Sequence, residues 1–204
     1  MVETLGKTKQ NDDVTKMDVF EAIYERRSIR KFLEKPVEHD KIVKILDARR
    51  WAPSGGNTQP WRFIVVDEKN LIKMIKMFSP GMFSEPSVLI VICRDIEEAR
   101  RKGGEDGERF VSIVDISMAT QNMMLAAHAL GLGTCVIRSF NKNVVRKLLE
   151  IPENIEPELL LAIGYPSYKP GKPPRKPLTS IVFFNKYGKS YEFATTRGTE
   201  TKGS

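Results

Sequence analysis

The sequence PSGGNTQPW, at residues 53–61, is the stretch from which the fold and a binding site can be worked out. Its two glycines let backbone amides come close to a ligand, and its two prolines limit how far the loop can relax. Asn57 and Gln59 each carry amide donor and acceptor atoms, which suit the polar edge of a planar ring. The loop therefore predicts a clamp for a planar polar ligand, and we expect a strand over residues 62–66 directly after it.

A cluster of cations lies upstream, in the sequence RRSIRKF at residues 26–32. If this segment is extended, Arg26, Ser28 and Arg30 project from one face, while Arg27 and Ile29 project from the other. Two guanidinium groups and a hydroxyl on one face would bind a phosphate through charge-assisted hydrogen bonds. The alternative is a solvated basic turn, because short arginine-rich turns are common on protein surfaces.

The composition is that of an ordinary globular protein, with 41% hydrophobic and 29% charged residues in a chain of 204. We expect a flexible N-terminal arm over residues 1–17, a single domain over 18–192 and a flexible tail over 193–204. No secretory signal is visible, and no apolar run approaches the roughly 20 residues that span a bilayer. A cytoplasmic location without membrane association is therefore expected.

The formal net charge of +7 has local excesses at residues 26–31 and 169–176. Two short clusters suit a few phosphates better than the long footprint of a nucleic acid, so we expect no nucleic-acid partner. Cys93 and Cys135 lie in apolar runs, which is typical of reduced, buried thiols. Neither CxxC nor HExxH occurs, and we expect no protein-bound metal.

The hydrophobic pattern predicts alternating but irregular helices and strands, which favours an α+β fold over a doubly wound sheet. The expected strands cover residues 62–66, 88–93, 134–137, 159–163 and 181–184. The expected helices cover residues 19–25, 40–50, 68–77, 110–130 and 141–149. The run 88–93 is apolar without alternation, so it predicts a central strand that is covered on both faces.

Two segments carry more specific expectations. Residues 94–109 are charged and contain glycines, which predicts a surface loop, with a mobile lid as a second interpretation. Residues 110–130 leave hardly any polar face, which predicts a helix buried all round and a homodimer built on it. The two histidines, His39 and His128, are expected to have structural roles.

The sequence lacks the common motifs GxGxxG, GxxxxGK[ST] and GxSxG, which disfavours a Rossmann site or a P-loop. With two distant histidines, neither a Ser/His/Asp nor a Cys/His constellation can be assembled. If the protein is an enzyme, we therefore expect its reactive group to be a cofactor.

Together with GLGT at residues 131–134 and GYP at 164–166, the two longer motifs appear in an order and spacing that resembles the FMN-dependent nitroreductase family. The resemblance covers nearly the whole folded part. It implies a nitroreductase-like α+β fold, in which helices flank a central mixed or antiparallel sheet. It also implies an interlocked homodimer that binds two FMN molecules at its interface.

The resemblance also implies a set of FMN-binding residues. Arg26, Ser28 and Arg30 would contact the phosphate and ribityl region, with Arg27 as a neighbour. Asn57 would contact the polar edge of the flavin ring, supported by Gln59. Pro53 and Ser54 would approach the ring from the partner subunit.

Four further positions follow from the same resemblance. Ile137 and Arg138 would lie near flavin N5, and Arg138 departs from the family, whose members often carry a small residue there. Arg175, with Lys172 as a weaker candidate, would return to the phosphate.

The implied reaction is ping-pong: NADH or NADPH gives a hydride to flavin N5, and a nitroaromatic or quinone then accepts two electrons. Neither a catalytic side chain nor a metal is implied. Other chemistries of the same fold stay open, namely reductive dehalogenation, flavin fragmentation and substrate dehydrogenation such as azoline oxidation. A non-catalytic flavin- or nucleotide-binding protein and an RNA-binding protein are further alternatives.

Overall fold

The computed structural model describes residues 17–190. Residues 1–16, which hold nearly all of the expected N-terminal arm, and residues 191–204, which hold the expected tail, lie outside the described residues. The chain divides into two compact units, of which the first ends at Pro170 and the second begins at Gly171. All of the β-strands and α-helices described below belong to the first unit.

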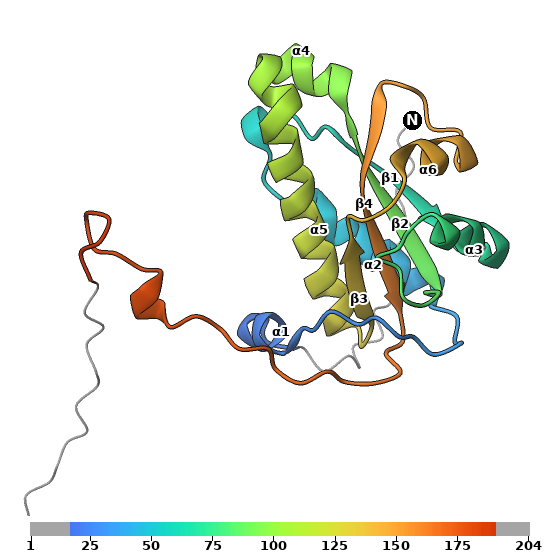
Figure 1. Cartoon of the computed structure of the whole chain (residues 1–204), viewed down its shortest axis with the longest axis horizontal. Coiled ribbons are helices and arrows are strands. Elements are labelled where there is room, and N and C mark those ends of the chain that lie inside the picture. The colour runs from blue at the N-terminus through green and yellow to red at the C-terminus, as the bar shows by residue number, and fades with distance from the viewer. Residues whose placement is uncertain (1–16, 191–204) are drawn as a thin grey trace, which may run out of the picture. The chain divides into compact units, whose positions relative to one another are not determined.

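The first unit is built on a four-stranded antiparallel sheet (Figure 1). Its strands are β1 (Trp61–Val66), β2 (Val88–Asp95), β3 (Gly133–Ile137) and β4 (Ile155–Gly164), and their order in the sheet is β1-β2-β4-β3. The expectation for the run 88–93 is confirmed, because β2 is a central strand whose side chains from Leu89 to Cys93 are 0% exposed. β3 forms one edge of the sheet.

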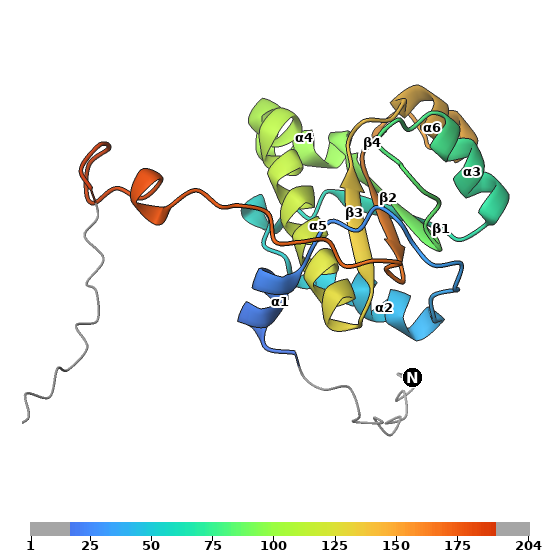
Figure 2. The same cartoon turned by 60° about the horizontal axis from the view of Figure 1, so that its bottom comes forward.

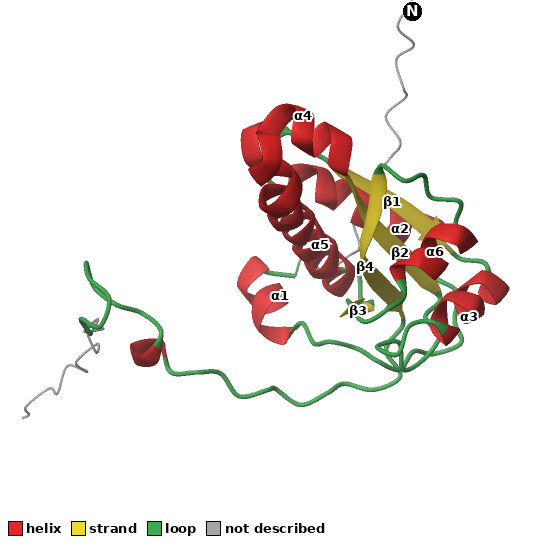
Figure 3. Ribbon diagram, turned by 45° about the horizontal axis from the view of Figure 1, so that its top comes forward, coloured by secondary structure: helices red, strands yellow, loops and turns green. Residues whose placement is uncertain are grey.

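Helices cover both faces of the sheet, as the α+β prediction requires. The helices are α1 (Val19–Glu25), α2 (His39–Ala48), α3 (Lys69–Met77), α4 (Ile96–Asp106), α5 (Ser112–Ala129) and α6 (Lys142–Leu148). One core cluster joins α2 and α5 to one face, through residues such as Ile45, Met123 and Ile90. A second cluster joins α3 and α6 to the opposite face, through residues such as Ile75 and Val145 (Figure 3).

The expectation of a loop over residues 94–109 is wrong. The first two of these residues end β2, and the others form α4 and most of a π-helical turn, Gly107–Val111, that leads into α5 (Figure 2). Asp95 caps α4 by accepting a hydrogen bond from the amide of Glu98 at 2.9 Å. The high charge belongs to a solvated helix face, on which Glu105 pairs with Arg109 at i,i+4. The glycines leave one mark on the helix, a kink at Gly104, where φ is 63°.

Helix α5 is present as predicted, but the expectation that it is buried all round is wrong for the single chain. Its inner face packs in the core, where Ala119, Met123 and Ala127 are 0% exposed. Its outer face leaves Ile113 and Val114 exposed. The continuous helix Ile96–Ala129 is long and apolar enough to cross a membrane by length and composition alone, and a core helix packed on a sheet passes the same test.

In the described part of the second unit, residues 171–190, the expected strand over 181–184 is absent. A 3₁₀ turn, Leu178–Ser180, precedes these residues, and a single bridge joins Phe183 to Ser190. Among residues 171–190, this bridge is the only strand-like pairing described, so the apolar run 181–184 does not form a strand.

Candidate functional site

The segment 26–32 is extended and lies along the edge strand β3. Ser28 forms a parallel bridge with Thr134, and the amide of Ile29 donates to the carbonyl oxygen of Thr134 at 2.8 Å. Further along, Phe32 forms a bridge with Pro166, just after β4. The cationic motif is therefore fixed against the sheet by backbone pairing.

The glycines of the two short motifs permit this close packing. A Cβ atom on Gly133 would lie 2.5 Å from Cγ1 of Ile29, and one on Gly164 would lie 2.9 Å from Cδ1 of Phe32. Real Cβ atoms do not approach other atoms so closely, so any larger residue would displace the segment. Gly133 and Gly164 thus couple the motifs GLGT and GYP to the cationic segment.

The predicted alternation of side chains is confirmed. Arg27 and Ile29 are buried, at 8% and 6% exposed, whereas Arg26, Ser28 and Arg30 lie on the opposite, more accessible side. Arg27 donates hydrogen bonds to the carbonyl oxygen of Tyr24 at 2.7 Å and to that of Arg26 at 2.8 Å. Its guanidinium therefore satisfies carbonyl groups at the end of α1 and faces away from the side that carries Ser28.

Arg26 lines a cavity of about 430 Å³ at the C-terminal end of α5. Lys169 and His128 contribute polar groups to this cavity, and Ile29 and Leu132 contribute apolar ones. Burial lowers the pKa of His128, and the positive charges of Arg26 and Lys169 lower it further. The ring is thus held neutral beside cations, and its buried Nε2 has no hydrogen-bond partner among the described residues.

Arg30 lines a second, much smaller cleft together with Ile137 and residues 81–84. The hydroxyl of Ser84 donates to the carbonyl oxygen of Arg30 at 2.8 Å, and the amide of Gly81 donates to that of Ser139 at 3.3 Å. The loop 79–84 thus forms a wall that the sequence did not predict. Its Pro80-Gly81 step marks a turn, but nothing local indicates that the turn lies beside Arg30.

The outer edge of β3 stays open beyond Thr134. Because the Thr134 carbonyl points outward to Ile29, the backbone groups of Val136, two residues further, also face outward. Ile137 is buried, at 3% exposed, so its side chain belongs to the core and its contribution to a ligand would come from the backbone. Arg138 follows at the end of the strand, with an exposed side chain.

The loop 53–61 is held by the first turn of α5. The amide of Gly55 donates to Oδ1 of Asp115 at 3.0 Å, and a Cβ on Gly55 would lie 2.5 Å from Cγ1 of Val111. Asp115 is 1% exposed, and burial raises its pKa. Sequence analysis missed this residue, because an isolated acid in an apolar helix carries no motif.

Asn57 and Gln59 are both exposed at the tip of this loop. Both have left-handed backbone conformations, with φ of 52°. Nε2 of Gln59 donates to Oδ1 of Asn57 at 2.9 Å, and the Gln59 amide donates to the hydroxyl of Ser54 at 3.1 Å. These contacts make Ser54, Asn57 and Gln59 one rigid unit, so any ligand contacts made by these three residues come from the same protomer.

The structure does not bring the two halves of the site together within one protomer. Asp115, which holds the loop, and His128, which borders the Arg26 cavity, are 13 residues apart on α5. At about 1.5 Å per residue, they are about 20 Å apart along the helix axis. Asn57 and Arg26 are therefore attached to opposite ends of α5.

Lys172 and Arg175 belong to the second compact unit. Arg175 donates to the carbonyl oxygens of Pro174 at 3.2 Å and Pro173 at 3.5 Å, both within its own segment. The assignment of these two residues to the phosphate stays a prediction.

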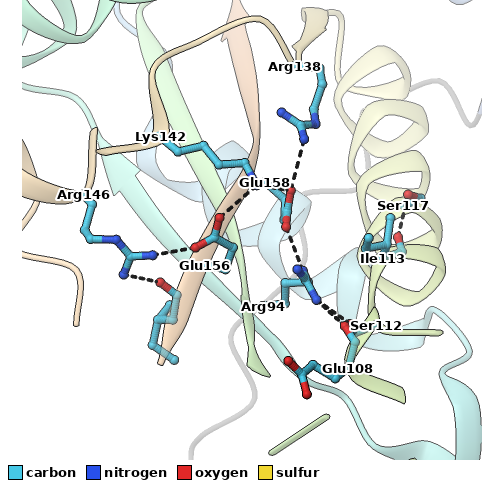
Figure 4. Close-up of polar contacts among 11 residues, drawn as sticks. Arg94, Glu108, Ser112, Ile113, Ser117, Arg138, Lys142, Arg146, Glu156 and Glu158 are labelled. Atoms are coloured by element: carbon cyan, nitrogen blue, oxygen red, sulfur yellow. Dashed lines mark hydrogen bonds and ion pairs between the residues drawn. The ribbon is translucent and has the colours of Figure 1, made fainter. Parts of the chain in front are cut away.

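A charged network joins the end of β3 to the start of α5 (Figure 4). Its centre is Glu158 on β4, which is 5% exposed. Oε1 of Glu158 accepts from Nε of Arg94 at 2.8 Å, and Oε2 accepts from Nζ of Lys142 at 2.7 Å. Arg94 also donates to the Ser112 hydroxyl at 3.2 Å and to the Glu108 carbonyl oxygen, at the start of α5.

The same network sets the charge state of its central carboxyl. Burial alone would raise the pKa of Glu158, but the hydrogen bonds from Lys142 and Arg94 outweigh it and lower the pKa. The carboxylate is therefore ionised at neutral pH and holds both cations.

The family of this chain is identified by comparison with known proteins. A model of the nitroreductase family matches residues 23–86 and 74–165 of the chain. The chain belongs to the nitroreductase family. A candidate NADH dehydrogenase/NAD(P)H nitroreductase of Methanothermobacter thermautotrophicus is 37% identical to this chain over 164 residues, which cover 78% of this chain and 82% of the relative.

Solved structures agree with this membership. A nitroreductase-family protein of Clostridium difficile has a TM-score of 0.73 and 33% identity, over 83% of this chain and 99% of that protein. An NADPH:FMN oxidoreductase of Vibrio harveyi, solved with NAD⁺, has a TM-score of 0.75 and 25% identity, over 85% of this chain and 79% of that protein.

In this nitroreductase-family chain, the accessible side of the segment 26–32 and the open edge of β3 offer donors for a phosphate and for a planar ring. A cavity lined by Arg26 and by the buried-side residues Arg27 and Ile29 has room and positive charge beside this segment, and Arg30 lines a separate cleft. The residues present fit a long ligand with one anionic end.

Proposed function

We propose that this nitroreductase-family protein is an FMN-dependent NAD(P)H oxidoreductase that reduces nitroaromatic or quinone-type acceptors by two-electron, ping-pong transfer. Family membership supports flavin chemistry, and the names of its relatives include an NAD(P)H nitroreductase and an NADPH:FMN oxidoreductase. The observation that carries the proposal is the surface along β3, where Arg26, Ser28 and Arg30 lie on one side of an extended segment beside an open strand edge.

We assign different roles to the two accessible arginines, and the distance between them supports this division. Four residues of extended chain separate them by about 13 Å, which is more than one phosphate group spans. Arg26 lines the large cavity and would hold the phosphate, with Ser28 beside the ribityl chain. Arg30 lines the cleft shared with Ile137 and would lie toward the flavin ring.

The backbone at Val136 and Arg138 would meet the ring edge. The outward N–H group of Val136 provides a fixed donor without any side-chain acid or base, in keeping with the lack of a catalytic constellation in the sequence. The flavin, when bound, supplies the hydride and electron transfer. The residues of the chain then bind the phosphate, orient the ring and keep the nicotinamide or the acceptor against it.

We propose a homodimer as the working form, located in the cytoplasm. Exposed apolar side chains lie on α1, on the outer face of α5 and just before the loop 53–61; they are Val19, Phe20, Ile23, Tyr24, Trp51, Ile113 and Val114. Because Asn57 and Arg26 are attached to opposite ends of α5, a second copy would supply the loop to each site. Pro53, Ser54 and Asn57 would then all come from the partner.

The test begins with flavin binding. The purified protein is expected to be yellow and to bind FMN, and Arg26→Ala is expected to weaken FMN binding by about 10- to 100-fold, the range of one or two charge-assisted hydrogen bonds. Riboflavin, which lacks the phosphate, is the matched control, and its affinity should change less than twofold. Equal losses for both ligands would contradict the assignment of Arg26.

The second part of the test concerns electron transfer. Anaerobic NADH or NADPH should bleach the flavin absorbance, and a nitroaromatic or a quinone should restore it. Bleaching by neither nicotinamide would contradict the proposed oxidoreductase and favour the other flavin chemistries of the fold.

A further inference from the structure

Arg138 is the most exposed member of the charged network around Glu158 (Figure 4). Its guanidinium lies 3.7 Å from Oε2 of Glu158, and its side chain is 63% exposed. That same oxygen accepts a hydrogen bond of 2.7 Å from Lys142, and the other oxygen accepts one of 2.8 Å from Arg94. Glu158 therefore has a short partner on each oxygen, and Arg138 has the longest contact with it.

The network has more positive than negative charge. Glu156 accepts from Lys142 at 2.9 Å and pairs with Arg146 at 2.5 Å, so it does not compensate Arg138. Two carboxylates thus face four cations, and the surplus is two positive charges. The cations are Arg94, Arg138, Lys142 and Arg146.

The position of Arg138 places part of this positive charge at the end of β3. Arg138 directly follows β3, whose outer edge is open at Val136. Glu158 links the guanidinium of Arg138 to Arg94, which donates to Ser112 at the start of α5, and β3 is an edge strand of the sheet. A planar molecule placed along the open edge of β3 would have this guanidinium beside it.

We propose that Arg138 makes the site selective for electron acceptors that carry an acidic group, a carboxylate or a sulfonate, next to the reducible ring. The inference rests on the proposed function, because it concerns the acceptor of that same site. The acidic group of the acceptor would bind the guanidinium of Arg138 in place of Glu158, which lies 3.7 Å from it. Lys142 and Arg94 keep Glu158 compensated, so the exchange leaves no buried charge unpaired.

The experiment compares acceptors that differ in charge. The flavin of the holoenzyme is reduced with NADH, and its reoxidation is followed by stopped flow with 4-nitrobenzoate against 4-nitrobenzamide and with naphthoquinone sulfonate against naphthoquinone. Arg138→Gln is expected to lower the second-order rate constant for the acidic acceptors about tenfold, as for one partly exposed charge-assisted contact. The neutral acceptors should change less than twofold, and Arg138→Lys should restore part of the loss.

Arg101→Gln is the matched control. Arg101 lies on α4 at 3.7 Å from Glu98 and its side chain is 70% exposed, so the substitution removes an ion pair of the same length and similar exposure elsewhere. It should leave the ratio of acidic to neutral rates unchanged. Added salt should lower the acidic rates in the wild type and in Arg101→Gln, and much less in Arg138→Gln.

The outcomes separate this inference from the proposed function. Equal effects of Arg138→Gln on acidic and neutral acceptors would overturn the role of Arg138, as would a variant that slows only bleaching by NADH. Both results would leave the oxidoreductase in place, since the flavin is still reduced and reoxidised. A protein that binds no FMN would overturn the proposed function itself.

Discussion

The two ends of α5 hold the two halves of the sequence motif in different ways. At its first turn, Asp115 fixes the loop 53–61 through the amide of Gly55, and the loop satisfies its own polar groups internally. At its last turn, His128 borders an open cavity with Arg26, and a buried ring nitrogen has no partner among the described residues. Oδ2 of Asp115 is likewise buried without a hydrogen-bond partner among the described residues, so the two ends differ in the cavity and its positive charge, which are found at the second end.

The two ends of α5 would contribute different parts of the proposed site. The loop 53–61 would contact the planar ring, and Arg26 would contact the phosphate, but about 20 Å of helix separates the two ends. In the proposed homodimer, one protomer would therefore present half of each of two sites. Substitutions at one end at a time, followed by measurements of stability and FMN affinity, test this difference.

The largest effect is expected from Glu158→Ala, on β4, whose ion pairs reach the start of α5 through Arg94. The substitution leaves Arg94 and Lys142 without their shared carboxylate, and removing one partner of a buried ion pair costs about 3 to 5 kcal/mol. Chemical denaturation would measure this loss. Arg138→Gln, which removes only the exposed third cation, should cost less than about 1 kcal/mol. Similar losses for both variants would contradict the central place of Glu158.

A smaller effect is expected at the cationic end, from Gly133→Ala. The new methyl group would lie 2.5 Å from Ile29, so the segment 26–32 must move, at a cost of about 1 to 3 kcal/mol. FMN affinity should fall with stability, because Arg26 and Ser28 move with the segment. In Gly103→Ala the methyl group would have open space, so that α4 variant should keep FMN affinity unchanged and not lose stability. Unchanged FMN affinity in Gly133→Ala would contradict the claim that the segment 26–32 binds FMN.

The smallest effect concerns pH and the loop end, in Asp115→Asn. Burial raises the pKa of Asp115, so its neutral form is favoured in the folded state. The wild type thus loses stability relative to the variant as pH rises through the raised pKa, whereas the two should match more closely at acidic pH. Thermal unfolding at acidic and neutral pH would show the difference growing with pH. A difference that is the same at both pH values would contradict a buried, titrating Asp115.

The sequence predicted the main elements of the sheet and the alternation of the segment 26–32, because both follow from local patterns of apolar and charged residues. The β2 run without polar residues required a central strand. An extended backbone placed Arg27 and Ile29 on one side, and the structure shows that this side is buried. The residues 94–109 were misjudged because a solvated helix and a charged loop share one composition, and here ion pairs and the Asp95 cap decide for the helix.

The missed parts of the site depend on contacts between distant segments. Asp115 acquires its role only through Gly55, which is 60 residues away, and Glu158 acquires its role through Arg94 and Lys142. The loop 79–84 is held beside Arg30 by the hydrogen bond that the hydroxyl of Ser84 donates to the carbonyl oxygen of Arg30. Neither periodicity nor a motif encodes such pairings, since each partner alone resembles an ordinary surface or core residue.

The central claim is that each site combines Arg26 of one protomer with the loop 53–61 of another. Mixed dimers of Arg26→Ala and Asn57→Ala chains, isolated with two different tags, test it most directly, once each variant alone is shown to bind FMN weakly. The account predicts that the mixed dimer recovers one site with wild-type affinity, because one combination contains neither substitution. A mixed dimer with no tight site would show that Arg26 and Asn57 act within the same protomer and would contradict the account.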